Sequence, residues 1–295
     1  MKTVPLTVLA HEGPGVRAYL LMMAEAGFRP SAIIVTVASH GESSGDGKKV
    51  GRLLPRFWRL KYANRVQELR RMYWPRRIRR QHPELYASMA AGMTPIIGDS
   101  ANMLDKISGS FSYEDYSDNV SRVLVRDYRD PKIGRSLAGV PSAPVLYTGG
   151  GILSSELVRS GQKFVHVHPG NLPHIRGADG LLWSTLVRRQ PGAACFYMNA
   201  GIDTGEIIES IDLPVVKFGV PDSKRPDDRT LYQALFSFYD PLMRAKLFND
   251  VVSKYGGELP GSGVAQSTDE GITYHFMHDQ LKELALRQIF VSEGA

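Results

Sequence analysis

Two short apolar runs near the start of the chain constrain its fold more than any other feature. Residues 32–38 read AIIVTVA, a continuous and largely β-branched run, and residues 4–10 form a second apolar run. Between them, Val16 to Ala26 has helical spacing, and Gly27 and Pro30 close that helix. A strand that is apolar on both sides is typical of a parallel sheet covered on both faces. The strand–helix–strand order therefore predicts a βαβ unit and an α/β fold with a mainly parallel sheet.

A second stretch, Phe164 to Ile208, carries candidate chemistry. Its first five residues, FVHVH, alternate, so that His166 and His168 share one face of a strand. The strand should end at Pro169-Gly170, which places both imidazoles at its carboxyl end, where open α/β sheets bind their ligands. Further along, Asp203 lies between glycines in a turn that joins two more strands, which is a way to present a carboxylate over a cleft.

This stretch resembles the signature of the formyltransferases that use 10-formyltetrahydrofolate. The family pattern is Asn-x-His-Pro-Ser-x-x-Pro, then x-x-Gly, an amphipathic helix, a strand and a closing Gly-Ile-Asp-x-Gly-x-Ile-Ile. The matching pieces here are residues 166–173 (HVHPGNLP), Gly177 and residues 201–208 (GIDTGEII). His166 stands where the family has its catalytic asparagine, and Asn199 stands where many members have aspartate.

The resemblance implies a Rossmann-like formyltransferase fold with a mainly parallel sheet over residues 1–213. A basic helical insertion would occupy about residues 40–93, and a smaller C-terminal α+β region would occupy residues 214–295. The implied activity is transfer of a formyl group from 10-formyltetrahydrofolate to a primary or hydroxylated amine, on a small or carrier-linked substrate.

The resemblance also assigns catalytic roles. His168 matches the catalytic histidine, which stabilises the oxyanion and can act as an acid. Asp203 matches the catalytic aspartate, which orients the histidine and stabilises its charge. His166 replaces an asparagine whose amide donates to the same oxyanion, and a neutral imidazole can also donate through one nitrogen.

A glycine-rich junction after the expected strand 143–148 is the candidate folate site. Three glycines at a strand-to-helix junction let the backbone approach a ligand closely, and the family holds the pterin there largely through backbone groups. The resemblance implies that the folate is held by Gly150, Gly151, Ile152, Leu153, Asn199 and Gly201.

Two other function classes stay open. His166, His168 and Asp203 have side chains that suit a metal-dependent hydrolase. The flanking residues match no known zinc motif, so we assign no metal ligand. The change at His166 also leaves open a formyltransferase-like protein with altered or lost catalysis.

The charge of the chain is concentrated in one segment. The net charge is +6, and residues 48–80 hold 13 Lys and Arg against one acid, Glu68, so the rest of the chain is net −6. Aromatic residues interleave with the cations, which predicts one or two basic amphipathic helices. We rank the partners of this segment as the chain's own acidic remainder first, an acidic carrier or nucleotide-linked acceptor second, and RNA third.

Composition indicates an ordinary globular protein. Of 295 residues, 43% are hydrophobic and 22% charged, and we expect a cytoplasmic protein because no signal-peptide layout or membrane-spanning run is present. The single cysteine, Cys195, is expected as a buried strand residue, and the oligomeric state is left open. Further strands are expected at Thr94–Gly98, Ser121–Arg126 and Ile211–Val216, and further helices at Arg229–Tyr255 and Met277–Phe290.

Overall fold

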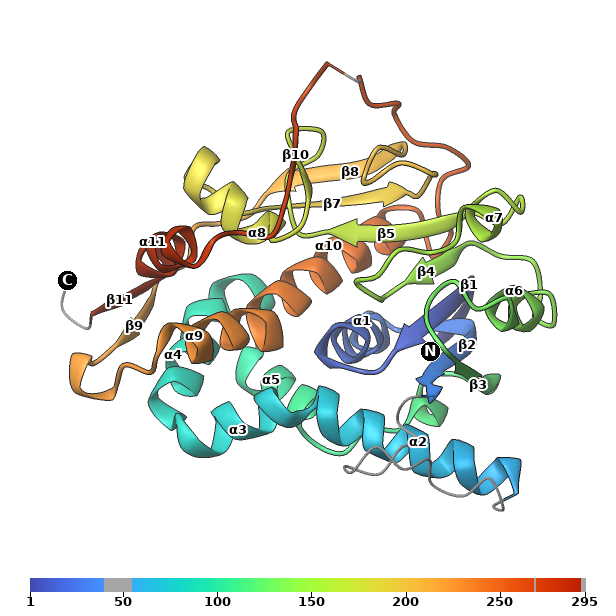
Figure 1. Ribbon diagram of the computed structural model, residues 1–295, viewed down its shortest axis with the longest axis horizontal. Coiled ribbons are helices and arrows are strands. Elements are labelled where there is room, and N and C mark those ends of the chain that lie inside the picture. The colour runs from blue at the N-terminus through green and yellow to red at the C-terminus, as the bar shows by residue number, and fades with distance from the viewer. Residues whose placement is uncertain (40–54, 268, 293–295) are drawn as a thin grey trace.

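The centre of the molecule is a seven-stranded sheet in the order β3-β2-β1-β4-β5-β7-β8 (Figure 1). The computed structural model describes residues 1–39, 55–267 and 269–292. The first five strands of that order are parallel, and β7 and β8 are antiparallel to their neighbours. The strands are β1 Lys2–His11, β2 Phe28–Ala38, β3 Val120–Val125, β4 Val145–Tyr147, β5 Phe164–His168, β7 Gly192–Tyr197 and β8 Ile207–Asp212. The predicted α/β fold with a mainly parallel sheet is confirmed.

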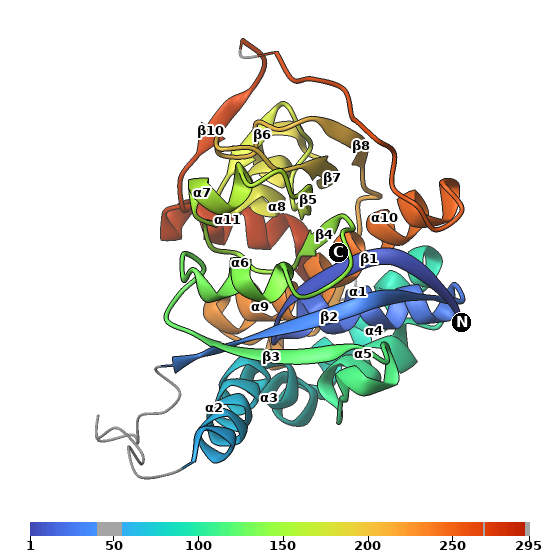
Figure 2. The same cartoon turned by 90° about the vertical axis from the view of Figure 1, so that its right-hand side faces the viewer.

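Helices surround this sheet, and four short strands form two small pairs. The helices are α1 Pro14–Glu25, α2 Arg56–Arg71, α3 Tyr73–Gln81, α4 Pro83–Ile97, α5 Ser100–Ser108, α6 Lys132–Leu137, α7 Ser155–Val158, α8 Gly180–Trp183, α9 Asp228–Ala234, α10 Asp240–Lys254 and α11 Asp279–Ile289. The pairs are β6 Ile175–Gly177 with β10 Ile272–Tyr274, and β9 Phe218–Val220 with β11 Phe290–Ser292. Figure 2 places the β6–β10 pair at the end of the molecule opposite α2, and Figure 1 places β10 there as well. No helix in the described parts of the chain is long and apolar enough to cross a membrane.

The core lies on both faces of the sheet. The larger cluster joins one face to α1 and α10, which pack side by side (Figure 1). The smaller cluster joins the other face to α6 and α7. Because the connection after β1 leads to one face and the connection after β4 leads to the other, these adjacent strands form a switch point. A crevice at the carboxyl ends of the strands is expected there.

Two of the expected strands are wrong or displaced. Residues 94–97 form the last turn of α4, where Pro95 is tolerated because only one backbone hydrogen bond is lost near the helix end. Gly98, at φ 79°, then ends the helix with its N–H on the Thr94 carbonyl. The strand expected at residues 211–216 is β8, which begins at Ile207 and ends at Asp212.

The C-terminal part of the chain contributes to the same core as the sheet. The helix expected over residues 229–255 is observed as α9, a π-helical turn and α10 without a break, and its apolar side packs on α1. The helix expected over residues 277–290 is α11. The division of the chain at residue 213 into two regions stays a prediction.

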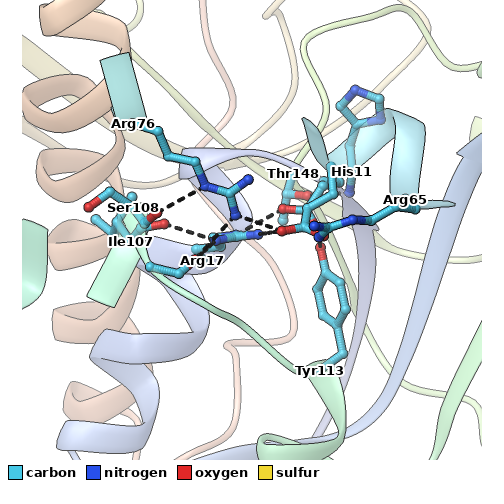
Figure 3. A network of polar contacts seen from close by, with 11 residues as sticks. His11, Arg17, Arg65, Arg76, Ile107, Ser108, Tyr113 and Thr148 are labelled. Atoms are coloured by element: carbon cyan, nitrogen blue, oxygen red, sulfur yellow. Dashed lines mark hydrogen bonds and ion pairs between the residues drawn. The ribbon is translucent and has the colours of Figure 1, made fainter. Parts of the chain in front are cut away.

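The basic segment forms helices, as predicted, although residues 48–54 lie outside the described residues. Its single acid, Glu68, contacts the body of the protein at Arg17, which Figure 3 labels together with Arg65 and Arg76. Glu68 accepts hydrogen bonds from Arg76 at 2.6 Å and Arg65 at 2.7 Å, and lies 3.6 Å from the buried Arg17 of α1. Here an acid of the basic segment pairs with an arginine of the body, whereas we expected cations of the segment to pair with acids of the body. Arg79 follows the expected pattern, with Asp105 of α5 at 2.9 Å.

Arg17 is the centre of this network. Its side chain is fully buried, donates from Nε to Glu12 Oε1 at 2.9 Å, and donates from Nη1 to the Ile107 and Gly109 carbonyls. Tyr113 donates to the other oxygen of Glu12 at 3.0 Å. The network thus connects the turn after β1, α1, the end of α5 and the basic segment.

Replacing Arg17 by Met should therefore destabilise the protein strongly. The variant leaves the Glu12 carboxylate buried without its cation, which should lower the free energy of unfolding by about 3–5 kcal/mol. Arg29→Met is the matched control, since its ion pair with Asp118 is exposed and should contribute less than about 1 kcal/mol. Urea unfolding of both variants measures the difference, and equal losses would show that the Arg17 network is no more important than a surface pair.

Candidate active site

The two histidines lie where the sequence predicts them. Strand β5 is an interior strand, parallel to β4 and antiparallel to β7, and it ends at His168 before Pro169-Gly170. The side chains of Val165 and Val167 enter the larger core cluster, so both imidazoles lie on the opposite face. His168 is buried and His166 is half-buried.

Asp203 reaches His168 although its loop leaves β7 beside the start of β5, and His168 lies at the end of β5. In the β5–β7 ladder His168 pairs with Ala194, whereas Tyr197, the last residue of β7, pairs with Val165. The loop after β7 must therefore fold back along β5 by about 10 Å, three strand residues. It does so, and Asp203 Oδ2 lies 3.4 Å from His168 Nδ1.

Hydrogen bonds hold the carboxylate of Asp203 in this position. Its Oδ2 accepts from the Gly177 N–H at 2.8 Å, and its main chain adopts a left-handed conformation at φ 54°. Gln266 donates to the Asp203 carbonyl at 2.9 Å and also to the Gly205 carbonyl. Gly177 comes from the first half of the predicted signature and Asp203 from the second, so one hydrogen bond joins the two.

Asn199 and Gly201, which were predicted to hold the folate, brace this same loop. Asn199 Oδ1 accepts from the Gly201 N–H at 2.9 Å and from the Thr204 hydroxyl at 2.8 Å. Both Asn199 and Gly201 are exposed. Their observed contacts shape the turn that carries Asp203, and their role toward folate stays a prediction.

His166 is fixed in one tautomer by the neighbouring strand. Its Nδ1 lies 2.8 Å from the Tyr147 carbonyl, which can only accept, so Nδ1 carries the proton and donates. A neutral imidazole has a single N–H, and Nε2 is left as an acceptor. The expectation that a neutral His166 donates to the oxyanion in place of an asparagine amide does not fit this geometry.

The predicted folate turn is packed against two tyrosines that the sequence reading did not single out. The Tyr147 hydroxyl accepts from the Gly151 N–H at 3.2 Å and donates to the Gly151 carbonyl at 2.8 Å. A Cβ at Gly151 would lie 2.3 Å from the Tyr128 ring, whereas Gly150 has open space around it. Ile152 is exposed and Leu153 is buried in the smaller core cluster. The turn therefore offers the backbone of Gly150 and the side chain of Ile152 to a ligand.

A row of aromatic rings crosses this edge of the sheet. Successive ring centroids lie 5.2 to 6.0 Å apart, in the order His11, Tyr128, Tyr147, His166 and Phe196. Three of the five rings, those of His11, Tyr147 and His166, lie at or near the carboxyl end of a parallel strand. Only His166 was predicted from the sequence, but the same position at a strand end could have identified His11 and Tyr147 as site residues. Tyr128 comes from the loop after β3, and no pattern marks it.

Burial keeps both imidazoles uncharged. Burial lowers the pKa of His166 to about 4, helped by the positive charge of Arg244, while the hydrogen bond to Tyr147 and the charge of Asp203 act in the other direction. Burial and Arg244 also lower the pKa of His168, against the opposing effect of Asp203. Near neutral pH the site therefore holds two neutral imidazoles beside one carboxylate.

Two glycines enclose the second ring nitrogen of His168. Its Nε2 is buried, and a Cβ at Gly170 or at Gly180 would lie 2.8 Å from it. Only hydrogen therefore fits at both positions while the ring keeps its place. Among the described residues, no group of three or more His, Cys, Asp and Glu is arranged to hold a metal ion.

Comparison with known proteins gives distant structural likenesses. No protein-family model and no curated protein matches the chain. A sugar N-formyltransferase from a Shewanella species is 11% identical, with a TM-score of 0.47 over 98% of this chain and 89% of that one. A 4-N formyltransferase from Francisella tularensis is 12% identical, with a TM-score of 0.46 over 100% and 90% of the two chains.

A third solved structure is the formyltransferase PseJ from Anoxybacillus kamchatkensis, in complex with UDP-4,6-dideoxy-4-formamido-L-AltNAc and tetrahydrofolate. It is 23% identical, with a TM-score of 0.36 over 53% of this chain and 75% of that one. All three are formyltransferases. Because every identity is below 25% and every TM-score below 0.5, the function of this chain has to be inferred from its own residues.

The low pKa of His166 should appear in the pH dependence of stability. Between pH 4 and pH 6.5 the unfolded histidine, with an ordinary pKa of about 6.5, binds a proton that the folded one does not. The free energy of unfolding should therefore rise with pH through this window, and the contribution should be lost as pH falls to about 4. His166→Asn should reduce that slope relative to the wild type. Urea unfolding at several pH values checks this, and an unchanged slope in His166→Asn would contradict it.

Proposed function

We propose that this protein transfers a formyl group from 10-formyltetrahydrofolate to a primary or hydroxylated amine of a small or carrier-linked substrate. The observation that carries the proposal is the approach of Asp203 to His168 at 3.4 Å. The two residues come from the two halves of the formyltransferase-like signature. They meet at the carboxyl end of an interior strand, on the face that also holds the glycine-rich turn.

The reaction makes demands that these residues can meet. The amine must attack the formyl carbon as a neutral base, and the tetrahedral intermediate then carries negative charge on its oxygen. One proton must leave the attacking nitrogen and one must reach the leaving nitrogen of the folate. The site must therefore hold an acceptor for the first proton and a donor for the oxyanion and the leaving group.

His168 is assigned to the oxyanion and the leaving nitrogen, and because it starts as a neutral imidazole, the proton that it donates there is the one that His166 takes from the amine and passes on. The Asp203 carboxylate beside Nδ1 stabilises the imidazole when it carries a proton, as the buried carboxylate does in other acid–base pairs. The hydrogen bond from Gly177 keeps that carboxylate in place during the reaction. Asp203 thus acts on the reaction through His168.

His166 is assigned to the first proton. Because Nδ1–H is bound to the Tyr147 carbonyl, Nε2 is the nitrogen that can accept a proton from the attacking amine. The folate is assigned to the turn at Gly150, Gly151, Ile152 and Leu153, where Gly150 is open and Ile152 is exposed. Because the Gly151 backbone is already bonded to the Tyr147 hydroxyl, a pterin that uses Gly151 has to displace that hydroxyl.

An acceptor screen with radiolabelled 10-formyltetrahydrofolate tests the proposal. The wild type should transfer label to at least one amine class, and His168→Ala and Asp203→Ala should each lower the rate on the order of 10²-fold or more without loss of folding. Asp250→Ala, an exposed carboxylate on α10, is the matched control and should keep the wild-type rate. Folate binding without turnover would contradict the proposal and favour a catalytically altered relative. Formate release that requires added metal ion would favour the hydrolase.

The role of His166 has its own test. His166→Ala should lose on the order of 10²-fold in rate, and added imidazole should restore part of it, because the missing group is a base. His166→Asn should stay as slow, since an amide cannot accept the proton. A His166→Asn variant as fast as the wild type would instead show that this position needs only a hydrogen-bond donor.

A further inference from the structure

A buried ion pair on α10 lies behind the two histidines. Asp240 Oδ2 accepts from Arg244 Nε at 3.0 Å and from Nη2 at 2.7 Å, and the two side chains are 2% and 16% exposed. Replacing such a pair by apolar residues is often neutral or stabilising, so stability alone gives little reason for it. The second oxygen of Asp240 is buried without a hydrogen-bond partner.

Arg244 extends from this pair to the catalytic strand. Its Nη1 donates to the Val167 carbonyl at 3.4 Å, and Val167 is the residue between the two histidines. A Cβ at Gly15 would lie 3.9 Å from Nη2, so the guanidinium also lies against the first turn of α1. The cation therefore sits where the end of β5 meets the start of α1.

The charges that face the imidazoles come from several elements. The groups that act on His166 are the Tyr147 carbonyl of β4, Asp203 of the turn after β7, Arg244 of α10 and the neighbouring His168. Those that act on His168 are Asp203, Arg244, Asp240 and the Ile175 carbonyl of β6. Asp203 acts on both histidines to raise the pKa, and Arg244 acts on both to lower it. Asp240 raises the pKa of His168 and is not among the groups that act on His166.

Resting on the proposed function, we propose that Arg244 is a positioning residue for formyl transfer: it holds the Val167 carbonyl at the end of β5, and its fixed charge adds to burial in keeping both histidines as neutral imidazoles. Without this cation, burial would be the main effect opposing the Asp203 carboxylate at both imidazoles and the Asp240 carboxylate at His168. A protonated His166 has no lone pair and cannot take the proton of the amine. Arg244 does not touch the reacting atoms in this role, and acts through the two histidines.

Three variants separate the charge of Arg244 from its packing. Arg244→Gln removes the charge, and Arg244→Lys keeps it and serves as the matched control. Arg244→Gln combined with Asp240→Asn removes both charges together, so that no unpaired charge is buried if the single variant fails to fold.

The decisive readout is an NMR titration of the histidine side chains in the free protein. In Arg244→Gln, the pKa of both His166 and His168 should rise by about one unit, while Arg244→Lys should resemble the wild type. In the double variant the pKa of His166 should still rise, because Asp240 does not act on it, and that of His168 should rise less. The acid limb of the rate–pH profile should move to higher pH in Arg244→Gln and stay near that of the wild type in Arg244→Lys.

These outcomes separate the inference from the proposed function. Unchanged histidine titrations in a folded Arg244→Gln protein, or an unchanged His166 in the double variant, would overturn the role of Arg244 even in an active enzyme. An absence of formyl transfer in the wild type would overturn the proposed function, while the titration of the free protein would still show whether Arg244 controls the charge of the site.

Discussion

The hydrogen bond from the Gly177 N–H to the Asp203 carboxylate is the contact on which the site depends. It joins two loops that leave β5 and β7 at opposite ends of their shared ladder. Gln266 holds the main chain of the Asp203 loop, and the Gly177 bond is what directs its carboxylate toward His168. The left-handed backbone at Asp203 is local strain that this contact helps to offset, whereas Gly177 adopts its positive φ without a side-chain clash.

Two buried arginines on neighbouring helices organise the interior around this site. Arg17 on α1 connects the turn after β1 to the basic segment, and Arg244 on α10 connects β5 to the start of α1. Each is paired with one buried carboxylate, Glu12 or Asp240; Arg17 also donates to two main-chain carbonyls and Arg244 to one. Carbonyl acceptors fix the position of a guanidinium without cancelling its charge, so each arginine can hold a loop or strand end and still act electrostatically at a distance.

The sequence allowed the sheet and the position of the histidines to be predicted because both follow from local patterns. Alternation and a Pro-Gly stop define β5, and apolar runs on either side of a helix define β1 and β2. Residues 94–97 were wrongly predicted as a strand because a short apolar run fits both a strand and a helix end, and only packing decides between them. The return of Asp203 along β5, the tautomer of His166 and the pairing of Glu68 with Arg17 depend on contacts between distant segments, which no local pattern encodes.

A crystal structure of the protein with tetrahydrofolate would test the central claim most directly. We predict that the pterin lies against the turn at Gly149–Leu153, with the nitrogen that carries the formyl group facing His166 and His168. Tyr128 or Tyr147 would have to move where the ligand needs the Gly151 backbone. Ordered folate bound elsewhere on the molecule, or an empty site at a saturating folate concentration, would contradict the assignment of this face as a formyl-transfer site.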